Sequence, residues 1–352
     1  MGYGTAGRFF HSPLLHAEPS TTVVAIVTSH PERIEHAHQD HPEAQVFASM
    51  EGLMDAASRL DLDLVVIASA NSMHVEQGLT ALAAGLHVVV DKPLAGTAPD
   101  AHKLLAGAHH SLLTVFHNRR WDSDFLSLQH VLEQGLLGAV HRFESRIERW
   151  RPRVRGGWRE SGNATEFGGL LLDVGSHLVD QAMQLFGPVE QVLCTTKSIR
   201  DPLGPEDDFC LTLEHSNGVS SHLSATAVAA APGPRLRALG TSGTFVVHGF
   251  DVQEMQLRSG MSPLDSEFGV PQDEPMLFLD PHHVGEAIER KAQVFKGDWN
   301  TFYRKVTQAI EHNEPLPVLA SDAVETLRVL DAARESATTQ RVVTLVPHAH
   351  HN

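Results

Sequence analysis

The chain contains only two cysteines among its 352 residues, Cys194 and Cys210. Both lie in strand-like stretches, and two cysteines do not form the disulfide framework that holds small secreted proteins together. We therefore expect reduced core cysteines in a cytoplasmic protein.

Long apolar runs and basic clusters are also missing. No run approaches the ~18 uncharged residues of a membrane-spanning helix, and the first residues lack the basic and apolar pattern of a signal peptide. Acidic residues outnumber basic ones by 43 to 27, so the net charge is −16 with neutral histidines. An acidic chain without a basic stripe argues against nucleic acids and membranes as partners.

Histidine is abundant, with 24 residues, but its clusters do not have a metal-ligand spacing on a defined element. These clusters are His36-His38-His41, His282-His283 and His348-His350-His351. We expect a solvated surface or tail at each cluster and predict no metal site.

The chain opens with a glycine-rich motif, Gly2-Tyr3-Gly4-Thr5-Ala6-Gly7. A G-x-G-x-x-G spacing allows a tight turn and a close backbone approach to a pyrophosphate, which faces the N-terminus of the following helix. We expect a dinucleotide to contact Gly2, Gly4, Thr5, Ala6 and Gly7. The motif normally follows a strand. We therefore expect either a misplaced start or a lost central strand, and favour a natural chain that begins upstream.

The next strand, expected over residues 22–28, ends at Thr28-Ser29-His30. An acidic residue at this position would accept from the ribose 2′-hydroxyl of NAD. Here Thr28 and Ser29 can donate hydrogen bonds to a 2′-phosphate, and His30 or Arg33 can supply positive charge. This pattern favours NADP over NAD.

Short apolar strands then alternate with helices, which predicts a doubly wound parallel sheet over residues 1–117. The strand at 87–90 is followed by Asp91-Lys92-Pro93. Ligands bind at the carboxyl ends of such strands, so we expect Lys92 to reach a ligand. The alternative is a surface cation in a loop.

Residues 118–345 have a different pattern, in which a run of strands follows one long helix. This order predicts an α+β domain with an open, mainly antiparallel sheet, and a tail at 346–352. The long helix is expected from about 168 to Phe186, because Gly187-Pro188 is a stop signal.

The long helix carries Asp173 and His177 four residues apart, so their side chains lie on one face. A carboxylate beside an imidazole favours the protonated ring and orients it, as a general base requires. The alternative is an amphipathic helix with a solvated polar face. The arginine-rich loop just before the helix, residues 149–159, is expected to be a lid, a subunit contact or a solvated loop.

Together these motifs resemble the glucose-fructose oxidoreductase, inositol dehydrogenase and MocA family, and the resemblance extends to about Leu345. The matching pieces, in order, are Gly2-x-Gly4-x-x-Gly7, Asn71-x-x-His74, Ala84-Gly85-x-His87, Asp91-Lys92-Pro93 and Gly168-Gly169-x-x-x-Asp173-x-Gly175-x-His177-x-x-Asp180. Residues 116–122 and 252–254 look most similar to the branch of NADP-dependent scyllo-inositol dehydrogenases. Two departures are Asp91 in place of the usual glutamate and Ser69-Ala70 in place of Thr-Pro.

The resemblance implies an enzyme that reversibly oxidises a secondary alcohol of a sugar or cyclitol, with catalysis by Lys92, Asp173 and His177. In addition to the residues named above, it implies cofactor contacts from Ser69, Asn71, His74, Asp91, Lys92 and Asn118. Substrate contacts are expected from Lys92, Asn118, Arg120, Trp121, Arg151, Asp173 and His177. NADP is the expected cofactor, with NAD as the alternative.

The exposed face of the open sheet predicts a homo-oligomer, a dimer or a tetramer, that uses this face. Two other functions stay open. One is an NADP-binding regulator of the same fold without turnover, because this family contains such proteins. The other is a glycosidase that uses NAD transiently as a redox agent.

Overall fold

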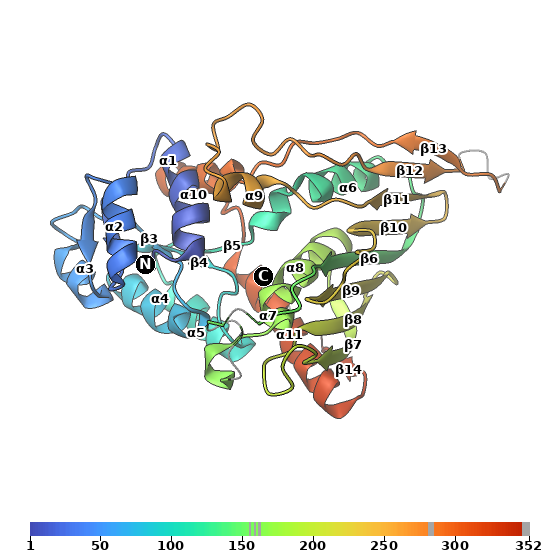
Figure 1. Ribbon diagram of the computed structural model, residues 1–352, viewed down its shortest axis with the longest axis horizontal. Helices are drawn as coiled ribbons and strands as arrows, with labels where there is room; N and C mark the ends of the chain where they lie inside the picture. The colour runs from blue at the N-terminus through green and yellow to red at the C-terminus, as the bar shows by residue number, and fades with distance from the viewer. Residues whose placement is uncertain (155, 158–159, 161–162, 281–284, 347–352) are drawn as a thin grey trace. The chain divides into compact units, whose positions relative to one another are not determined.

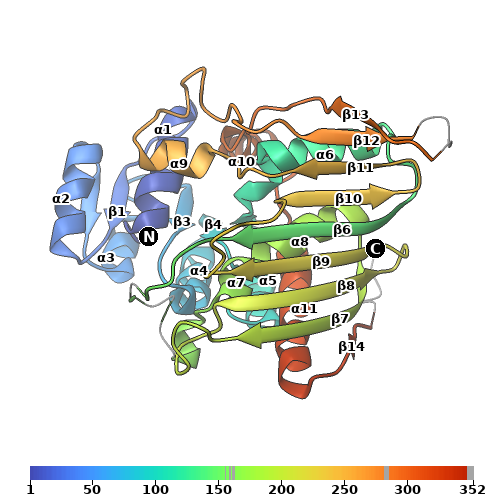
Figure 2. The ribbon, with the colours of Figure 1, turned by 45° about the vertical axis from the view of Figure 1, so that its right-hand side comes forward.

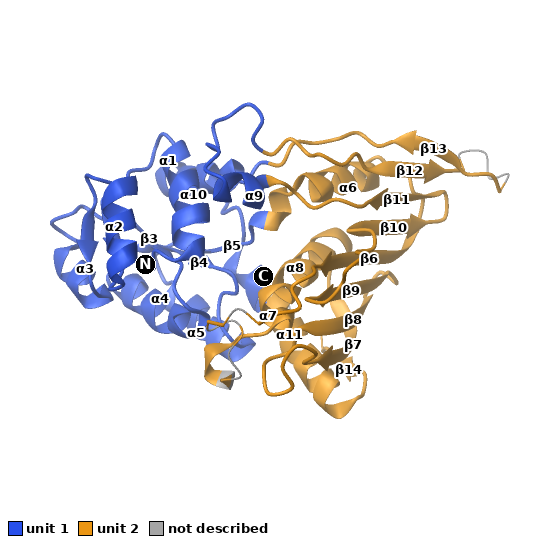
Figure 3. Ribbon diagram, viewed as in Figure 1, with its two compact units in different colours: residues 1–118, 253–268, 298–324 blue, residues 119–252, 269–297, 325–352 orange. Residues whose placement is uncertain are grey.

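The computed structural model describes residues 1–154, 156–157, 160, 163–280 and 285–346 (Figure 1). The chain forms two compact units that exchange segments along the sequence (Figure 3). Unit 1 contains residues 1–118, 253–268 and 298–324, and unit 2 contains residues 119–252, 269–297 and 325–352.

Unit 1 contains parallel strands that alternate with helices. Its strands are β1 (Ala25–Val27), β2 (Gln45–Phe47), β3 (Leu64–Ile67), β4 (His87–Asp91) and β5 (Leu113–Phe116). Its helices are η1 (Gly7–His11), α1 (Ser12–Ala17), α2 (Pro31–Asp40), α3 (Met50–Ala56), η2 (Asn71–Met73), α4 (His74–Ala83), α5 (Ala98–Gly107), α9 (Gln253–Arg258) and α10 (Asn300–His312). The strands form two parallel sheets, β1-β2 and β3-β4-β5. The buried β-branched run of β4 fits a strand covered on both faces.

The two parallel sheets of unit 1 are bridged by the first residues of the chain. The Met1 amine donates to the Val66 carbonyl at 2.7 Å, and the Ala68 N–H donates to the Met1 carbonyl at 2.8 Å. On the other side, the Gly2 N–H donates to the Val27 carbonyl at 3.0 Å. Beyond these contacts lies a cavity of about 600 Å³ lined by β1, β3 and one side of α10.

Local signals define several element boundaries in unit 1. The Ser49 hydroxyl accepts the Gly52 N–H, so α3 begins at Met50, as its N-cap pattern predicts. Thr97 caps α5 in the same way. The helix after the glycines contains a π turn at η1, which precedes Pro13. A proline ring clashes with the carbonyl four residues earlier in an α-helix, and a π turn is one way to relieve that contact.

Unit 2 is built on a nine-stranded sheet with the order β13-β12-β11-β10-β6-β9-β8-β7-β14. The strands are β6 (Val140–Glu148), β7 (Val189–Lys197), β8 (Asp208–His215), β9 (Ser220–Thr226), β10 (Leu236–Gly240), β11 (Gly243–Val247), β12 (Met276–Leu279), β13 (Ile288–Lys291) and β14 (Val343–Thr344). All neighbouring pairs are antiparallel except β6 and β9. The predicted fold class, a Rossmann domain followed by an open, mainly antiparallel sheet, is confirmed.

The helices of unit 2 pack on one face of this sheet (Figure 2). They are α6 (Ser123–Glu133), α7 (Leu170–Asp173), α8 (Gly175–Phe186) and α11 (Ala320–Thr339), whose first residues belong to unit 1; short turns lie at η3 (Asn118–Trp121) and η5 (Ala164–Glu166). The opposite face carries the outward side chains of β6 to β9. Cys194 is buried, whereas Cys210 on the neighbouring strand is exposed, and both are free thiols.

Two features of unit 2 differ from the prediction. The helix expected to run unbroken to Phe186 is divided at Val174 into α7 and α8, and the His177 N–H donates to the Val174 carbonyl only three residues earlier. Strands β12 and β13 were not predicted, since β13 is exposed along its whole length. Within the described residues, no helix is long and apolar enough to cross a membrane.

Candidate functional site

The glycine turn of unit 1 has the close contacts that require glycine. Gly2 has φ +85°, and a Cβ there would lie 2.7 Å from the Ala68 carbonyl oxygen. A Cβ on Gly7 would lie 2.1 Å from the Gly2 carbonyl oxygen. A Cβ on Gly4 would meet only the Arg33 guanidinium, 3.6 Å away, so this position is open toward a cation. A turn of this shape before a helix N-terminus fits a dinucleotide pyrophosphate.

The end of β1 supplies the groups expected near a nucleotide ribose. Thr28 is buried, and its backbone N–H donates to the Phe47 carbonyl at 2.9 Å. Its hydroxyl lies 3.4 Å from the His30 N–H and accepts from it. Ser29, His30 and Arg33 are exposed and so are accessible to a ligand. The hydroxyls and cations at the end of β1 therefore lie where the Rossmann fold binds the ribose of a dinucleotide.

Lys92 follows the carboxyl end of β4 and is half-buried. Its backbone N–H donates to Oδ1 of the buried Asp91 at 3.0 Å. The same Oδ1 lies 3.7 Å from Nε2 of His11, a fully buried residue in η1. The Nδ1 of His11 lies 2.7 Å from the hydroxyl of Tyr303 in α10. Three segments far apart in sequence therefore meet beside Lys92 within unit 1.

The charges of this group follow from their surroundings. Burial alone would raise the pKa of Asp91, but His11, Lys92 and His74 outweigh it and hold the pKa below its usual range. Burial, with the nearby Asp91 charge, raises the pKa of Tyr303 well above its ordinary value. Asp91 is therefore an ionised acceptor and Tyr303 a neutral donor.

His74 holds the other side of the Lys92 loop. It is buried, with Nδ1 2.8 Å from the Pro93 carbonyl oxygen and Nε2 3.4 Å from the Ser69 carbonyl oxygen. Burial lowers its pKa, so the ring is neutral at pH 7. This geometry gives His74 a structural task beneath the loop, while its predicted contact with a cofactor stays a prediction.

The remaining predicted residues of unit 1 have varied surroundings. Thr5 is exposed, whereas Ala6, Asn71 and Asn118 are buried. The Ser69 hydroxyl donates to Gln77 Oε1 at 2.8 Å. None of these placements tests a cofactor contact, so all five contacts stay predictions.

In unit 2, Glu206 fixes the start of the helix pair that carries Asp173 and His177. Its carboxylate accepts the Leu171 N–H at 3.0 Å, and its backbone carbonyl accepts the Leu170 N–H at 2.9 Å. Gly169 has φ +94°, and a Cβ there would lie 2.1 Å from the Glu206 carboxylate. This contact is the physical reason for glycine at that position. Burial raises the pKa of Glu206.

The polar side of α8 is buried, so the interpretation of a solvated polar face is wrong. His177, Asp180 and Gln181 are 7%, 2% and 0% exposed. Asp180 forms two hydrogen bonds with the Arg120 guanidinium, at 2.9 and 2.6 Å. The Gln181 amide donates to the Arg119 carbonyl at 2.8 Å. Helix α8 is thus bound to the turn η3, and Asp173, at the end of α7, is half-buried.

A fully buried arginine supports the same helix from the sheet. Arg235 donates to the Ser145 hydroxyl at 2.6 Å and to Gln181 Oε1 at 3.1 Å, and its Nε lies 3.4 Å from Asp124 Oδ2. Burial lowers the pKa of Arg235, partly offset by Asp124. Arg120 has a structural partner in Asp180, and Trp121 lies in the same turn half-exposed; their predicted substrate contacts stay predictions.

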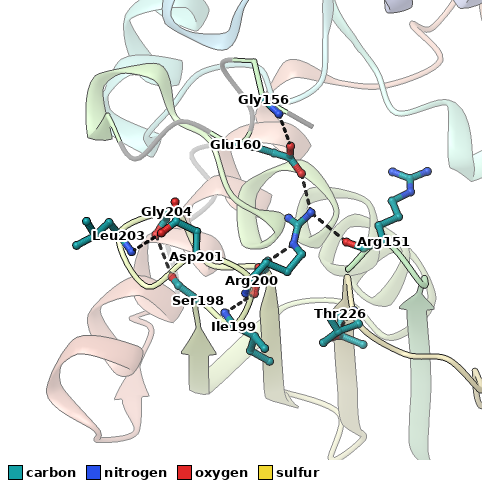
Figure 4. A network of polar contacts seen from close by, with 12 residues as sticks. Arg151, Gly156, Glu160, Ser198, Ile199, Arg200, Asp201, Leu203, Gly204 and Thr226 are labelled. Atoms are coloured by element: carbon teal, nitrogen blue, oxygen red, sulfur yellow. Dashed lines mark hydrogen bonds and ion pairs between the residues drawn. The ribbon is translucent and has the colours of Figure 1, made fainter. Parts of the chain in front are cut away.

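Arg151 lies in the loop after β6 and is exposed. Its carbonyl accepts from Arg200, which also pairs with Glu160 at 2.7 Å and Asp207 at 2.8 Å. Figure 4 shows the Arg151 guanidinium pointing away from this network. The expectation of a lid or subunit contact stays a prediction, and Arg155 and Arg159 lie outside the described residues.

The histidine clusters give no metal site within the part of the chain that the structure describes, where no group of three His, Cys, Asp or Glu could hold an ion. The clusters at 282–283 and 348–351 lie outside those residues. Sequence reasoning did not identify His11, Tyr303, Glu206 or Arg235. Only His11 had a nearby signal, since it lies four residues after Gly7, the last glycine of the motif.

The glycine turn and the Lys92 loop of unit 1, with the Gly169 to Asp180 region of unit 2, define a nicotinamide-dependent oxidoreductase of the Gfo/Idh/MocA family, and the chain belongs to it. Residues 1–118 match the family's NAD-binding Rossmann fold, and residues 129–345 match its C-terminal alpha/beta domain. The family predicted from the motifs is confirmed.

Individual relatives are similar over almost the whole chain. The scyllo-inositol 2-dehydrogenase (NADP(+)) IolW of Bacillus subtilis is 32% identical, over 98% of this chain and 94% of that protein. The uncharacterized oxidoreductase YdgJ of Escherichia coli is 33% identical, over 96% of this chain and 95% of that protein. The solved structure of the oxidoreductase YvaA from Bacillus subtilis has a TM-score of 0.91 at 31% identity, over 98% of this chain and 97% of that one.

Proposed function

We propose that the chain is an NADP-dependent dehydrogenase that acts on a secondary alcohol of a sugar or cyclitol. The observation that carries the proposal lies in unit 1, where the glycine turn and Lys92 both lie at carboxyl ends of parallel strands. Ligands of doubly wound sheets bind at that edge. Two relatives support the substrate class by their names, IolW and the 26% identical D-glucoside 3-dehydrogenase of Escherichia coli, which aligns with 53% of this chain.

The preference for NADP rests on the end of β1. Thr28 and Ser29 offer hydroxyls, and the Arg33 guanidinium lies beside Gly4 of the glycine turn. A carboxylate at residue 28, 29 or 30 would repel a 2′-phosphate, and these positions hold Thr, Ser and His. A cation there pairs with the phosphate instead.

In the proposed mechanism the chain supplies acid–base and electrostatic groups. The glycine turn of unit 1 would hold the dinucleotide, and a bound nicotinamide would supply the hydride acceptor. Lys92 donates a hydrogen bond to the alcohol oxygen and stabilises the negative charge that develops there. His177 removes the hydroxyl proton as general base, and Asp173 orients the substrate or the base. Arg120 and Trp121 are proposed to contact the polyol, together with Asn118 and Arg151.

We further propose a homodimer that uses the helix-free face of the nine-stranded sheet. This face carries half-exposed and exposed side chains of β6 to β9, among them Leu193 and Cys210. A free, exposed thiol fits a reducing compartment such as the cytoplasm. Light scattering after size exclusion measures the oligomer, and a glutamate at position 193 should weaken it.

The test of the function is a substrate panel that includes scyllo-inositol, other inositols and aldoses, each with NADP⁺ and NAD⁺ and followed by NADPH or NADH absorbance. We expect turnover with a cyclitol or sugar and NADP⁺. Lys92→Met should keep NADPH binding and lower turnover by about 100-fold or more, the range of a positioned acid or base. Lys103→Met, an exposed lysine paired with Asp100, is the matched control and should be fully active.

His177→Ala should lose turnover to a similar degree. Asp173→Asn should move the acid limb of the pH–rate profile to lower pH, because a carboxylate favours the protonated imidazole. Tight NADPH binding without turnover on the whole panel would favour the regulatory alternative. Equal dissociation constants for NADP and NAD would contradict the cofactor preference.

A further inference from the structure

The contact between His11 and Asp91 joins the two motifs of unit 1. His11 ends the π turn η1 that follows the glycines, and Asp91 ends β4 directly before Lys92. The ring of His11 also lies against Phe116, at the end of β5, with a centroid distance of 4.4 Å. His11 therefore touches the carboxyl ends of two neighbouring strands, where nucleotide sheets bind ligands.

The hydrogen-bonding roles in this group can be assigned from the charges. We assign the ring proton of His11 to Nε2, because a lone pair there would face the ionised Asp91 carboxylate at 3.7 Å. The other nitrogen, Nδ1, is then an acceptor, and the Tyr303 hydroxyl donates to it at 2.7 Å. The Nε2 of His11 faces Asp91 Oδ1 across 3.7 Å, which is longer than a hydrogen bond, and the same Oδ1 accepts the Lys92 backbone N–H at 3.0 Å.

We propose that His11, held by Tyr303, is a positioning residue that fixes the Asp91 carboxylate against Lys92. A second imidazole, His74, holds the Pro93 carbonyl on the other side of the loop. The peptide that carries Lys92 is therefore held at both neighbours by buried rings. A carboxylate kept in place as the acceptor of the Lys92 backbone N–H limits the movement of that peptide.

The contact between His11 and Asp91 also couples the glycine turn to Lys92. The helix that begins within the glycine motif reaches His11 through one π turn. A displacement of the glycine turn would therefore also displace His11 and its contact with Asp91. Displacement of a catalytic group by about 1 Å can cost about 100-fold in rate. The inference rests on the proposed catalytic role of Lys92, and its test is chosen to fail separately from that role.

The experiment measures the reactivity of Lys92 without a substrate. The full chain is treated briefly with acetic anhydride, and mass spectrometry gives the ratio of acetylation at Lys92 to that at Lys103. Four variants are compared with the wild type: His11→Leu, which has no donor; His11→Gln, whose amide can still donate toward Asp91; Tyr303→Phe, which keeps the ring; and Thr114→Val. The last removes a buried hydrogen bond of the same unit, from Thr114 to the Val318 carbonyl.

We expect His11→Leu to raise the Lys92 to Lys103 ratio by about threefold or more, because a carboxylate without His11 holds the Lys92 peptide less firmly and the side chain becomes more accessible to the reagent. Tyr303→Phe should change it in the same direction, and this variant decides the question if His11→Leu does not fold. His11→Gln and Thr114→Val should stay near the wild type. An unchanged ratio in His11→Leu overturns the proposal, as does a His11→Gln or Thr114→Val ratio that rises equally.

Kinetics with scyllo-inositol and NADP⁺ give the second measurement. His11→Leu should lower kcat about 10-fold with little change in KM or in NADPH affinity, and His11→Gln should recover most of it. If Lys92→Met is fully active, the proposed function fails at its catalytic residue. If Lys92→Met is inactive but His11→Leu has the kcat of the wild type, only the positioning role fails.

Discussion

The cavity between β1 and β3 should accept one more parallel strand, and an engineered extension before Met1 would test this. Met1 already pairs with Val66 and Ala68 of the β3 side, and Gly2 pairs with Val27 of β1. A parallel ladder repeats every two residues. The residue directly before Met1 would therefore pair with Ala25 and Val27, and the residue before that with Leu64 and Val66.

Four added residues, for example Val-Ala-Val-Ile, would extend this ladder along the cavity. About six new backbone hydrogen bonds contribute about 1 kcal/mol each. Two or three buried apolar side chains contribute about 2 kcal/mol each, and ordering the four residues costs roughly 2 kcal/mol each. The net gain is about 3 kcal/mol, which corresponds to a rise in Tm of about 6–12 °C for a unit of this size.

The buried amine of Met1 adds a dependence on pH. Burial lowers its pKa from 8.0 to about 5. Between these two values the unfolded chain binds a proton that the folded chain does not, so the free energy of unfolding falls as the pH falls from 8 toward 5. A shift of this size is about 4 kcal/mol over the whole window. An extension converts the amine to an amide and removes this loss.

The assay is urea unfolding of three proteins at several pH values between 5 and 8, with thermal melts of the same samples. The matched control carries Ser-Gly-Ser-Gly in place of the apolar residues, so it removes the amine without favouring a strand. We expect both extended proteins to lose the pH dependence of the Met1 amine, and only the apolar one to gain stability at pH 8. Equal Tm values for the two extensions at pH 8 would refute the strand site.

Three further outcomes are expected. Thr28→Asp should shift the ratio of dissociation constants toward NAD, because a carboxylate repels the 2′-phosphate and accepts from a 2′-hydroxyl, as fluorescence titration with both cofactors can measure. Arg235→Met should lower the free energy of unfolding by about 3–5 kcal/mol in urea melts, because Asp124 would keep a buried charge without its partner; a loss below about 1 kcal/mol would contradict this. Burial lowers the pKa of His74, so the stability that its neutral ring contributes is complete above pH 6.5 and is lost as the pH falls through the lowered value. His74→Asn should make the free energy of unfolding less dependent on pH in that window, and an unchanged slope would exclude His74 as the cause.

Much of unit 1 could be predicted because its signals are local. The Ser49 cap predicts the start of α3, and the β-branched run before Asp91 predicts β4 within one residue. Helix α2 was not predicted because Ile34 and Ala37 are its few apolar positions in a polar segment. Strand β2 has only three residues, too few for a periodic pattern.

The candidate site could also be predicted only where its signals are local in the sequence. The spacing of Asp173 and His177 is visible in the sequence, but the break at Val174 and the burial of α8 are not. Both follow from contacts with residues distant in the chain, such as Glu206 at the start of α7 and Arg235 beneath Gln181. A polar stripe that binds arginines inside a unit has the same sequence pattern as one that faces water.

His11 illustrates why the remaining part could not be predicted. Its partner Tyr303 is 292 residues away in the sequence. Tyr303 lies in α10, a segment of unit 1 that follows most of unit 2 along the chain. A histidine four residues after a glycine-rich motif carries no local signal of burial, yet here the ring is buried beside Asp91. Its tautomer follows only when the ionised carboxylate and the neutral tyrosine are placed on either side. Motifs therefore predict which residue types take part in the chemistry, whereas the residues that hold Lys92 in place become identifiable only from the folded unit.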